Sequence, residues 1–207
     1  MRGKFITLEG GEGAGKSTQA RLLTSWLQKR GIAVLETREP GGTPGADAIR
    51  ALLLENDIPF TATAEAHLFA AARGDHVEML IRPALADGKW VVCDRFIDST
   101  LAYQGAAGNL GIDTVRAINQ SVIGETWPDL TLLLRTDSDT GTRRAIARDG
   151  AEIDRFTNRD FAFHRAVADG FDRLAKAEPE RFAVIDGLGD IEQVAQSIQA
   201  AIEDRLL

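Results

Sequence analysis

Short apolar segments of high β-propensity alternate with segments of helical periodicity along the whole chain. The strand-like segments are expected at residues 4–9, 32–37, 90–93, 130–134 and 182–185. In the segments between them apolar residues recur three or four positions apart, as they do after residue 16 at Leu22, Leu23, Trp26 and Leu27. This alternation predicts an α/β fold, in which a five-stranded parallel sheet carries helices on both faces.

Helices are expected at 16–30, from the turn at 40–45 to residue 55, and at 62–86, 97–104, 113–123, 138–148, 160–177 and 190–206. The segment 62–86 is predicted as one long helix that Gly74 or Pro83 could bend, and 105–111 is predicted as a loop. Neither a repeat nor a low-complexity linker interrupts the pattern, so we expect the 207 residues to form a single domain.

A glycine-rich segment follows the first expected strand, with the sequence Gly10-Gly11-Glu12-Gly13-Ala14-Gly15-Lys16-Ser17-Thr18. It matches the phosphate-binding loop, in which a glycine and four residues precede Gly-Lys-Ser. The glycines allow backbone N–H groups to turn toward a polyphosphate, Lys16 can place its charge on the β- and γ-phosphates, and Ser17 can ligate Mg²⁺. Because a strand precedes the loop and a helix follows it, we expect a nucleoside triphosphate site rather than a chance glycine-rich turn.

Ligands of such sheets bind beyond the carboxyl ends of the strands, and charged residues lie at two of these ends. Arg38 follows the second strand and could hold another phosphate, although a surface charge beside a turn is equally consistent. Asp94 and Arg95 end the third strand, where an acid can ligate Mg²⁺ or its water and an arginine can brace the transferring phosphate. Asp94 could instead only cap the next turn, and Cys93 is interpreted as a packing residue.

Two helical segments carry candidates for binding a nucleobase and a sugar. Phe69 and Arg73 share a helix face, so one could stack on a base and the other bond its edge, or they could be a core residue and a solvated end. The second set follows Arg95 at helical spacing and comprises Ser99, Thr100, Tyr103 and Gln104. Tyr103 could exclude a 2′-hydroxyl by its bulk. At the start of the glycine loop, Glu9 could contact sugar or metal, whereas Glu12 could be only a solvated turn residue.

Arginines are concentrated in one late segment, at positions 143, 144, 148 and 155. This segment, about 142–158, lies where a phosphoryl-transfer enzyme would place a lid. The glycine loop has no basic residue between Gly10 and Gly15, so transition-state charge needs another donor, such as a lid arginine. The interleaved acidic residues also allow an ordinary solvated helix face.

Composition limits the partners and the compartment. The net charge of −7 argues against a general nucleic-acid or anionic-membrane surface. The only cysteine, Cys93, excludes an internal disulfide and fits a reducing compartment. The three histidines show no zinc-ligand spacing, no stretch is long enough to span a bilayer, and the apolar run after Lys4 is too short for a signal peptide. We expect a cytoplasmic protein.

The chain resembles the bacterial thymidylate kinases, which are nucleoside monophosphate kinases. The resemblance covers nearly the whole chain. It rests on the arginine-rich stretch that ends at Asp154-Arg155 and on four segments, which are Glu9–Thr18, Thr37-Arg38-Glu39-Pro40-Gly41-Gly42, Leu68–Arg73 and Asp94–Gly105. It implies phosphorylation of dTMP to dTDP by ATP and Mg²⁺ for dTTP biosynthesis, by direct in-line transfer, in an enzyme that is typically a homodimer.

The resemblance also implies roles for the phosphate-binding residues. Lys16, Ser17 and Thr18 would serve the ATP phosphates and the metal. Arg38 and Arg95 would hold the phosphate of dTMP, while Asp94 and Glu9 would lie near the metal and the substrate sugar. The catalytic arginine would come from the lid, with Arg148 and Arg155 as the candidates.

For the base, the resemblance implies that Phe69 stacks on thymine and Arg73 contacts its carbonyl edge. Thr100 and Gln104 would line the base pocket, and Tyr103 would disfavour a ribonucleotide. Adenine contacts are expected from the backbone near Asp186-Gly187-Leu188-Gly189. The chain departs from the family pattern at Thr157, where relatives often have a glutamate, so Glu152 or Asp154 would have to supply an acidic partner.

Three alternatives remain from the sequence. A kinase for another nucleoside monophosphate or a deoxynucleoside would share the fold and differ in the base pocket. A GTP-binding switch protein is disfavoured because no Asn-Lys-x-Asp segment occurs and Asp186–Gly189 comes too late in the chain. A non-catalytic nucleotide-binding module is disfavoured because Lys16, Ser17, Asp94 and Arg95 are all present.

Overall fold

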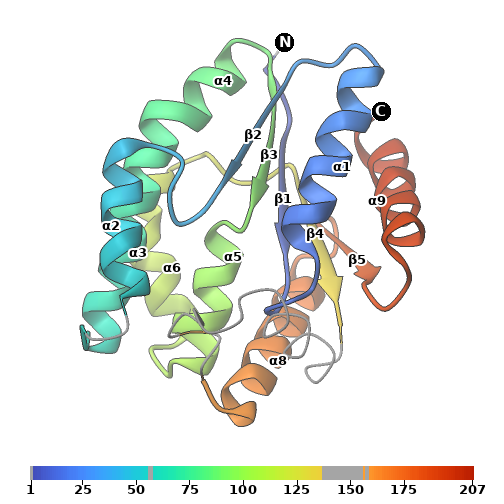
Figure 1. Ribbon diagram of the computed structural model, residues 1–207. Coiled ribbons are helices and arrows are strands. Elements are labelled where there is room, and N and C mark those ends of the chain that lie inside the picture. Colours follow the sequence, from blue (N-terminus) through green and yellow to red (C-terminus); the bar gives the residue numbers. More distant parts are fainter. Residues whose placement is uncertain (1, 56–57, 137–155, 157–158) are drawn as a thin grey trace.

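A five-stranded parallel sheet forms the centre of the molecule in the computed structural model, which describes residues 2–55, 58–136, 156 and 159–207 (Figure 1). The strands are β1 (Phe5–Glu9), β2 (Val34–Arg38), β3 (Trp90–Asp94), β4 (Leu130–Arg135) and β5 (Phe182–Asp186). Their order across the sheet is β2-β3-β1-β4-β5. The predicted fold class is confirmed.

Alternate residues of the strands pack on opposite faces of the sheet, as the period of a strand requires. Ile6, Leu8 and Val92 join a core with α1 (Lys16–Lys29) and α9 (Ile191–Leu206). Phe5 and Cys93 join the core on the other face, which confirms Cys93 as a packing residue. Figure 1 shows α1 and α9 together on one side of the sheet, with α3 and α6 on the other side.

The remaining helical segments of the described residues include those that cover the second face. They are α2 (Pro44–Leu54), α3 (Ala62–His76), a π-helical turn (Val77–Ile81), α4 (Arg82–Ala86), α5 (Ile97–Thr100), a second π-helical segment (Leu101–Ala107), α6 (Ile112–Ile123) and α8 (Phe161–Ala177). The residues expected to start two helices, Asp160 and Asp190, are instead their N-caps, because each side chain accepts backbone N–H bonds. The helix expected at 138–148 lies outside the described residues.

Helical winding spans 62–86 as predicted, and its irregular part is the π-helical turn Val77–Ile81. The N–H of Arg82 bonds to the carbonyl of Val77, five residues back, just before Pro83. Proline has no N–H and its ring collides with the carbonyl four residues earlier, so the widened turn accommodates it. Gly74 marks no break; a Cβ there would lie 3.2 Å from a methyl of Val122, so glycine lets α3 approach α6 closely.

The predicted loop at 105–111 also starts too early, because helical winding continues through Ala107. A Cβ on Gly105 would lie 3.1 Å from the Cα of Ile112, so this wide turn packs directly on the start of α6. Within the described parts of the chain, no helix combines the length and apolar character needed to cross a membrane.

Candidate active site

The glycine loop joins the end of β1 to the start of α1, as predicted. Gly10, Gly13 and Gly15 have φ angles of 138°, 67° and 88°, which side chains disfavour. At Gly10 a Cβ would also lie 2.4 Å from the carbonyl oxygen of Leu134 on β4. The loop is therefore tied to the centre of the sheet by close backbone packing.

Lys16 is folded back over this loop. Its Nζ donates a 2.7 Å hydrogen bond to the carbonyl oxygen of Gly11. Burial, and secondarily the positive charge of Arg95, lowers the pKa of Lys16 to about 8. An anionic ligand at this position would favour the charged form of Lys16.

A cavity of about 490 Å³ opens beyond the carboxyl ends of β1, β2 and β3. Most of the side chains predicted to bind substrate lie in its wall, together with Lys16, Ser17 and Asp94; they are Arg38, Phe69, Arg95, Ser99, Thr100, Tyr103 and Gln104. Phe69 is half-buried and faces this cavity, so it is more than a core residue. Arg38 remains exposed, 3.5 Å from Asp47.

Arg95 is the most constrained cation of this wall. Its φ angle of 68° is rare for a residue with a side chain and turns the arginine back across the end of β1. One guanidinium nitrogen donates to the carbonyl of Gly10 and to Ser99, at 3.1 and 3.0 Å. The other lies 2.6 Å from the carboxylate of Glu12, so Glu12 is not the solvated turn residue considered from the sequence.

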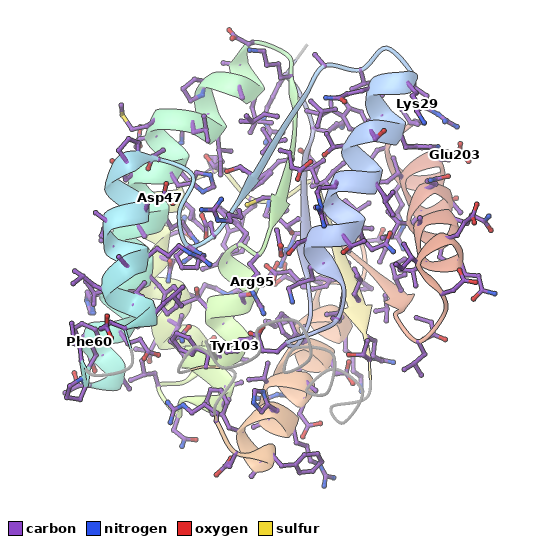
Figure 2. All side chains as sticks on the ribbon, in the orientation of Figure 1. Lys29, Asp47, Phe60, Arg95, Tyr103 and Glu203 are labelled. Atoms are coloured by element: carbon purple, nitrogen blue, oxygen red, sulfur yellow. The ribbon has the colours of Figure 1, made fainter. Side chains whose placement is uncertain are left out.

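The Tyr103 ring lies against the Arg95 guanidinium, 5.2 Å from Cζ to the ring centre, and Figure 2 shows the two residues next to each other where β3 leads into α5. The hydroxyl of Tyr103 donates to Glu12 at 2.9 Å. Burial alone would lower the pKa of Arg95, but the carboxylate of Glu12 and other nearby acids raise it. Arg95 therefore stays positively charged beside the cavity.

Asp94 and Ser17 form a pair between the two predicted phosphate sites. The hydroxyl of Ser17 donates to Oδ2 of Asp94. The other carboxylate oxygen, Oδ1, is enclosed and has no hydrogen-bond partner among the described residues. A carboxylate with an unsatisfied oxygen beside a hydroxyl is a donor set that suits Mg²⁺. No group of three or more metal-ligating side chains occurs in the described residues, so such an ion would depend on phosphate and water as well.

Arg73 lies behind the wall of the cavity, with only 2% of its surface exposed, so its interpretation as a solvated helix end was wrong. Its guanidinium donates to Glu39, Asn119 and Thr100 at 2.9, 2.5 and 2.9 Å. Thr100 itself faces the cavity. In this arrangement Arg73 acts on the cavity through Thr100.

Glu9 is also enclosed behind the wall. Its carboxylate accepts hydrogen bonds from the backbone N–H of Phe96, at 2.8 Å, and from the hydroxyl of Ser99, at 2.6 Å. Burial, and then the nearby charge of Asp98, raises the pKa of Glu9 to about 8. Both oxygens are used inside the protein, so Glu9 holds the start of α5 in place.

A second cavity of about 780 Å³ lies on the other side of Lys16 and Ser17. Its wall combines Gly13 to Thr18 with Gly187, Gly189 and the first turn of α9. Gln19 fixes this arrangement, because its amide nitrogen donates to the carbonyl of Ile191 at 2.9 Å. The backbone near 186–189 thus lies on the cavity where adenine contacts were expected, whereas Gly10 and Gly11 face a small cavity of about 60 Å³ beside α8.

The predicted lid mostly lies outside the described residues, including Arg148, Arg155, Thr157, Glu152 and Asp154. Phe156 is described. Its ring centre lies 5.7 Å from that of Phe69, and Phe156 lines the cavity of 490 Å³.

Several residues of this site were not identified from the sequence. Arg50 lines the cavity of 490 Å³ and donates to the carbonyl oxygen of Pro40 at 2.7 Å. Glu39 and Asn119 hold Arg73, and Glu65 holds Gln104. Glu39 belongs to a segment that was singled out, but the sequence carries no signal of which arginine it pairs with.

Comparison with known proteins identifies relatives over the whole chain. A family model described as "Thymidylate kinase" matches residues 8–198. The thymidylate kinase of Rhodopseudomonas palustris strain TIE-1 is 52% identical over 210 residues, covering 100% of this chain and 91% of the relative. That of Rhizorhabdus wittichii strain RW1 is 50% identical over 207 residues and the full length of both. The crystal structure of thymidylate kinase from Ehrlichia chaffeensis matches with a TM-score of 0.81 and 33% identity, over 98% of this chain and 99% of that one.

Proposed function

The chain belongs to the thymidylate kinase family, and from this premise we propose that its two cavities hold dTMP and ATP on either side of Lys16 and Ser17. The reaction is the phosphorylation of dTMP to dTDP, and ATP is the phosphoryl donor of the family. One observation carries the assignment: Lys16 and Ser17 line both cavities. Donor and acceptor phosphates can therefore meet at these residues, as direct in-line transfer requires.

In this proposal dTMP occupies the cavity of 490 Å³ with its phosphate toward Arg95 and Arg38. Arg95 is held in place by backbone and side-chain bonds, so it needs little rearrangement to receive the phosphate. Arg38 is exposed and would close on the ligand. The acceptor is already a phosphate oxygen, so no strong general base is needed.

The base and sugar lie deeper in the same cavity. Phe69, which faces the cavity and contacts the ring of Phe156, stacks on thymine. Thr100 and Gln104 bond the edge of the base, and Arg73 orients Thr100 from behind. Tyr103, held by Glu12 and packed against Arg95, excludes a 2′-hydroxyl. Ser99 connects Arg95 to Glu9, which positions rather than touches the substrate.

The phosphates of ATP lie over the glycine loop, and its base lies toward Gly187 and Gly189. Lys16 exchanges its hydrogen bond to the carbonyl of Gly11 for bonds to the β- and γ-phosphates. Mg²⁺ would be held by Ser17 and Asp94, whose Oδ1 has no other partner among the described residues, while Glu9 supports the site from behind. When bound, the ion neutralises phosphate charge.

The lid belongs to the proposal because the glycine loop has no basic residue between Gly10 and Gly15, so the transition-state charge needs another donor. Arg148 or Arg155 would close on the γ-phosphate from the segment 142–158, within a single domain of 207 residues. Such an arginine is worth roughly 10³ to 10⁵ in rate in related chemistry.

We also propose a homodimer that works in the cytoplasm, without nucleic acid or membrane partners. Apolar side chains on the outer side of the second helical layer support the dimer: Leu52 on α2 and Met79 in the π-helical turn are 46% and 68% exposed. Light scattering at assay concentration tests this part, and a monomeric mass would refute it without affecting the reaction.

The function is tested by mixing the purified protein with ATP and Mg²⁺ and following ADP release in a coupled assay. The acceptors are dTMP, dUMP, dGMP, AMP, CMP and thymidine. Strong release with dTMP and weak release with the others is the expected result. Preference for another monophosphate would overturn the proposed roles of Phe69, Arg73 and Thr100. An absence of ADP release with every acceptor would overturn the proposed reaction.

A further inference from the structure

The amide of Gln104 is held in one orientation by a buried carboxylate. Gln104 is 3% exposed, lies in the π-helical segment after α5, and lines the substrate cavity. Its Nε2 donates a 2.9 Å hydrogen bond to Oε1 of Glu65, which lies on α3 and is 8% exposed. The NH₂ group of an amide donates and a carboxylate oxygen accepts, so this hydrogen bond holds the NH₂ group of Gln104 toward Glu65. The hydrogen bond to Glu65 thus distinguishes the nitrogen end of the Gln104 amide from its oxygen end.

The carbonyl end of the same amide is left for a ligand. No residue that the structure describes donates a hydrogen bond to Oε1 of Gln104. This oxygen is also not among the fully enclosed, unpartnered oxygens of the described residues, so it keeps accessible surface. Because Gln104 is otherwise buried and borders the cavity, that surface belongs to the cavity. The wall therefore presents a hydrogen-bond acceptor here.

One helical turn earlier, Thr100 presents the opposite polarity. Its Oγ1 accepts a 2.9 Å hydrogen bond from the guanidinium of Arg73, which can only donate. Arg73 is itself fixed by Glu39 and Asn119. The hydroxyl proton of Thr100 is therefore the part of this side chain that is left to donate.

A donor beside an acceptor distinguishes the two kinds of pyrimidine. The edge of thymine offers the O4 acceptor next to the N3–H donor, whereas cytosine offers an NH₂ donor next to the N3 acceptor. Building on the proposed function, we propose that Glu65 is a specificity-determining positioning residue. It turns the carbonyl oxygen of Gln104 toward N3–H of the base, and it thereby favours dTMP over dCMP. Glu65 touches no substrate in this proposal and acts only through Gln104.

The variant Glu65→Gln tests this directly. A glutamine at position 65 can donate as well as accept, so it releases the amide of Gln104 to turn its NH₂ group toward the cavity. The ratio of kcat/KM for dTMP to that for dCMP should fall by about 10- to 100-fold, the size expected for one misdirected buried hydrogen bond. The KM for ATP should stay within about twofold.

Two further variants separate positioning from a structural effect. Glu178→Gln is the matched control, because Glu178 is also a hydrogen-bonded glutamate but pairs with Arg116 and Arg181. It should leave the dTMP to dCMP ratio unchanged. Gln104→Leu should lower the ratio by itself, and adding Glu65→Gln to it should cause no further change, since both act through one amide.

The outcomes are separable. A wild-type protein that does not phosphorylate dTMP overturns the proposed function, whereas a selective wild type with an equally selective Glu65→Gln variant overturns only this inference. If Glu65→Gln does not unfold cooperatively, the wild type is measured with N3-methyl-dTMP as an inhibitor. If the inhibition constant is at least about 10-fold higher than the KM of dTMP, the result supports the acceptor at Gln104. An inhibition constant equal to that KM overturns it.

Discussion

Replacing Arg95 by alanine is the most direct test of the site. The change removes a positive charge that lies at the wall of the substrate cavity and bonds to Gly10, Ser99 and Glu12. Because the side chain is held in place before substrate arrives, its loss removes a preorganised contact to the phosphate. The variant keeps Lys16 and every glycine of the loop.

The size of the effect follows from the number of contacts. Arg95 can offer two charge-assisted hydrogen bonds to a phosphate, each worth about 1.5 to 3 kcal/mol. Their sum of about 3 to 6 kcal/mol corresponds to a fall in kcat/KM for dTMP of roughly 10² to 10⁴. Removing the guanidinium also removes the 2.6 Å ion pair to Glu12, although Tyr103 still donates to that carboxylate. We expect a loss of about 1 to 2 kcal/mol in the free energy of unfolding.

The assay combines three measurements on Arg95→Ala. ADP release gives kcat/KM for dTMP, titration with a fluorescent ATP analogue gives the affinity for the donor, and urea unfolding gives stability. Affinity for ATP should change by no more than about threefold, because Arg95 lies on the dTMP side of Lys16. Arg30→Ala is the control, since Arg30 pairs with Glu203 on the surface, away from both cavities. Wild-type kcat/KM in Arg95→Ala would refute the assignment.

Three further predictions concern buried charges. Arg181→Met should lower the free energy of unfolding by about 3 to 5 kcal/mol in urea, because Asp98 is fully buried and loses its bidentate partner; an unchanged midpoint would contradict this. The affinity for ATP, measured by calorimetry, should fall as pH rises through about 8, where Lys16 loses its charge, and Lys16→Met should abolish that dependence. Glu9 has its folded pKa raised from 4.5 to about 8, so its stabilising contribution is fully present below pH 4.5 and is lost as pH rises through about 8. The free energy of unfolding of Glu9→Gln should therefore fall less steeply than that of the wild type over this range, and parallel curves would refute the shift.

The sheet could be predicted from the sequence because its signals are local. Each strand is a short run of apolar, often β-branched residues, and each observed strand begins within two residues of its expected start. The glycine loop has a fixed spacing, and the parallel topology places Arg38, Asp94 and Arg95 at one edge without further information. The π-helical turn before Pro83 was not predictable in this way, since a proline can equally bend, restart or end a helix.

The contacts behind the cavity could not be predicted because each joins residues far apart in the chain. Arg73 and Glu39 are separated by 34 positions, and Gln104 and Glu65 by 39. Helical spacing correctly placed Thr100 and Gln104 on one face, but it carries no information about which buried group orients them. For Arg73 the same reasoning left a contact to the edge of a base and a solvated helix end both open, since a charged residue on a helix is usually exposed.

The buried acidic residues orient hydrogen-bond donors, a role that the net charge of −7 does not reveal. Glu39 and Glu65 are almost completely buried, and each accepts a hydrogen bond from a donor that lies in the cavity wall or directly behind it. A buried carboxylate is costly unless its partners are well placed, so each of these residues holds its donor in a single orientation. The side chains that face the substrate, Thr100 and Gln104, are neutral and could offer either polarity by themselves. The charges one layer deeper decide which atom each presents, and variants in that layer should change the choice of substrate more than its turnover.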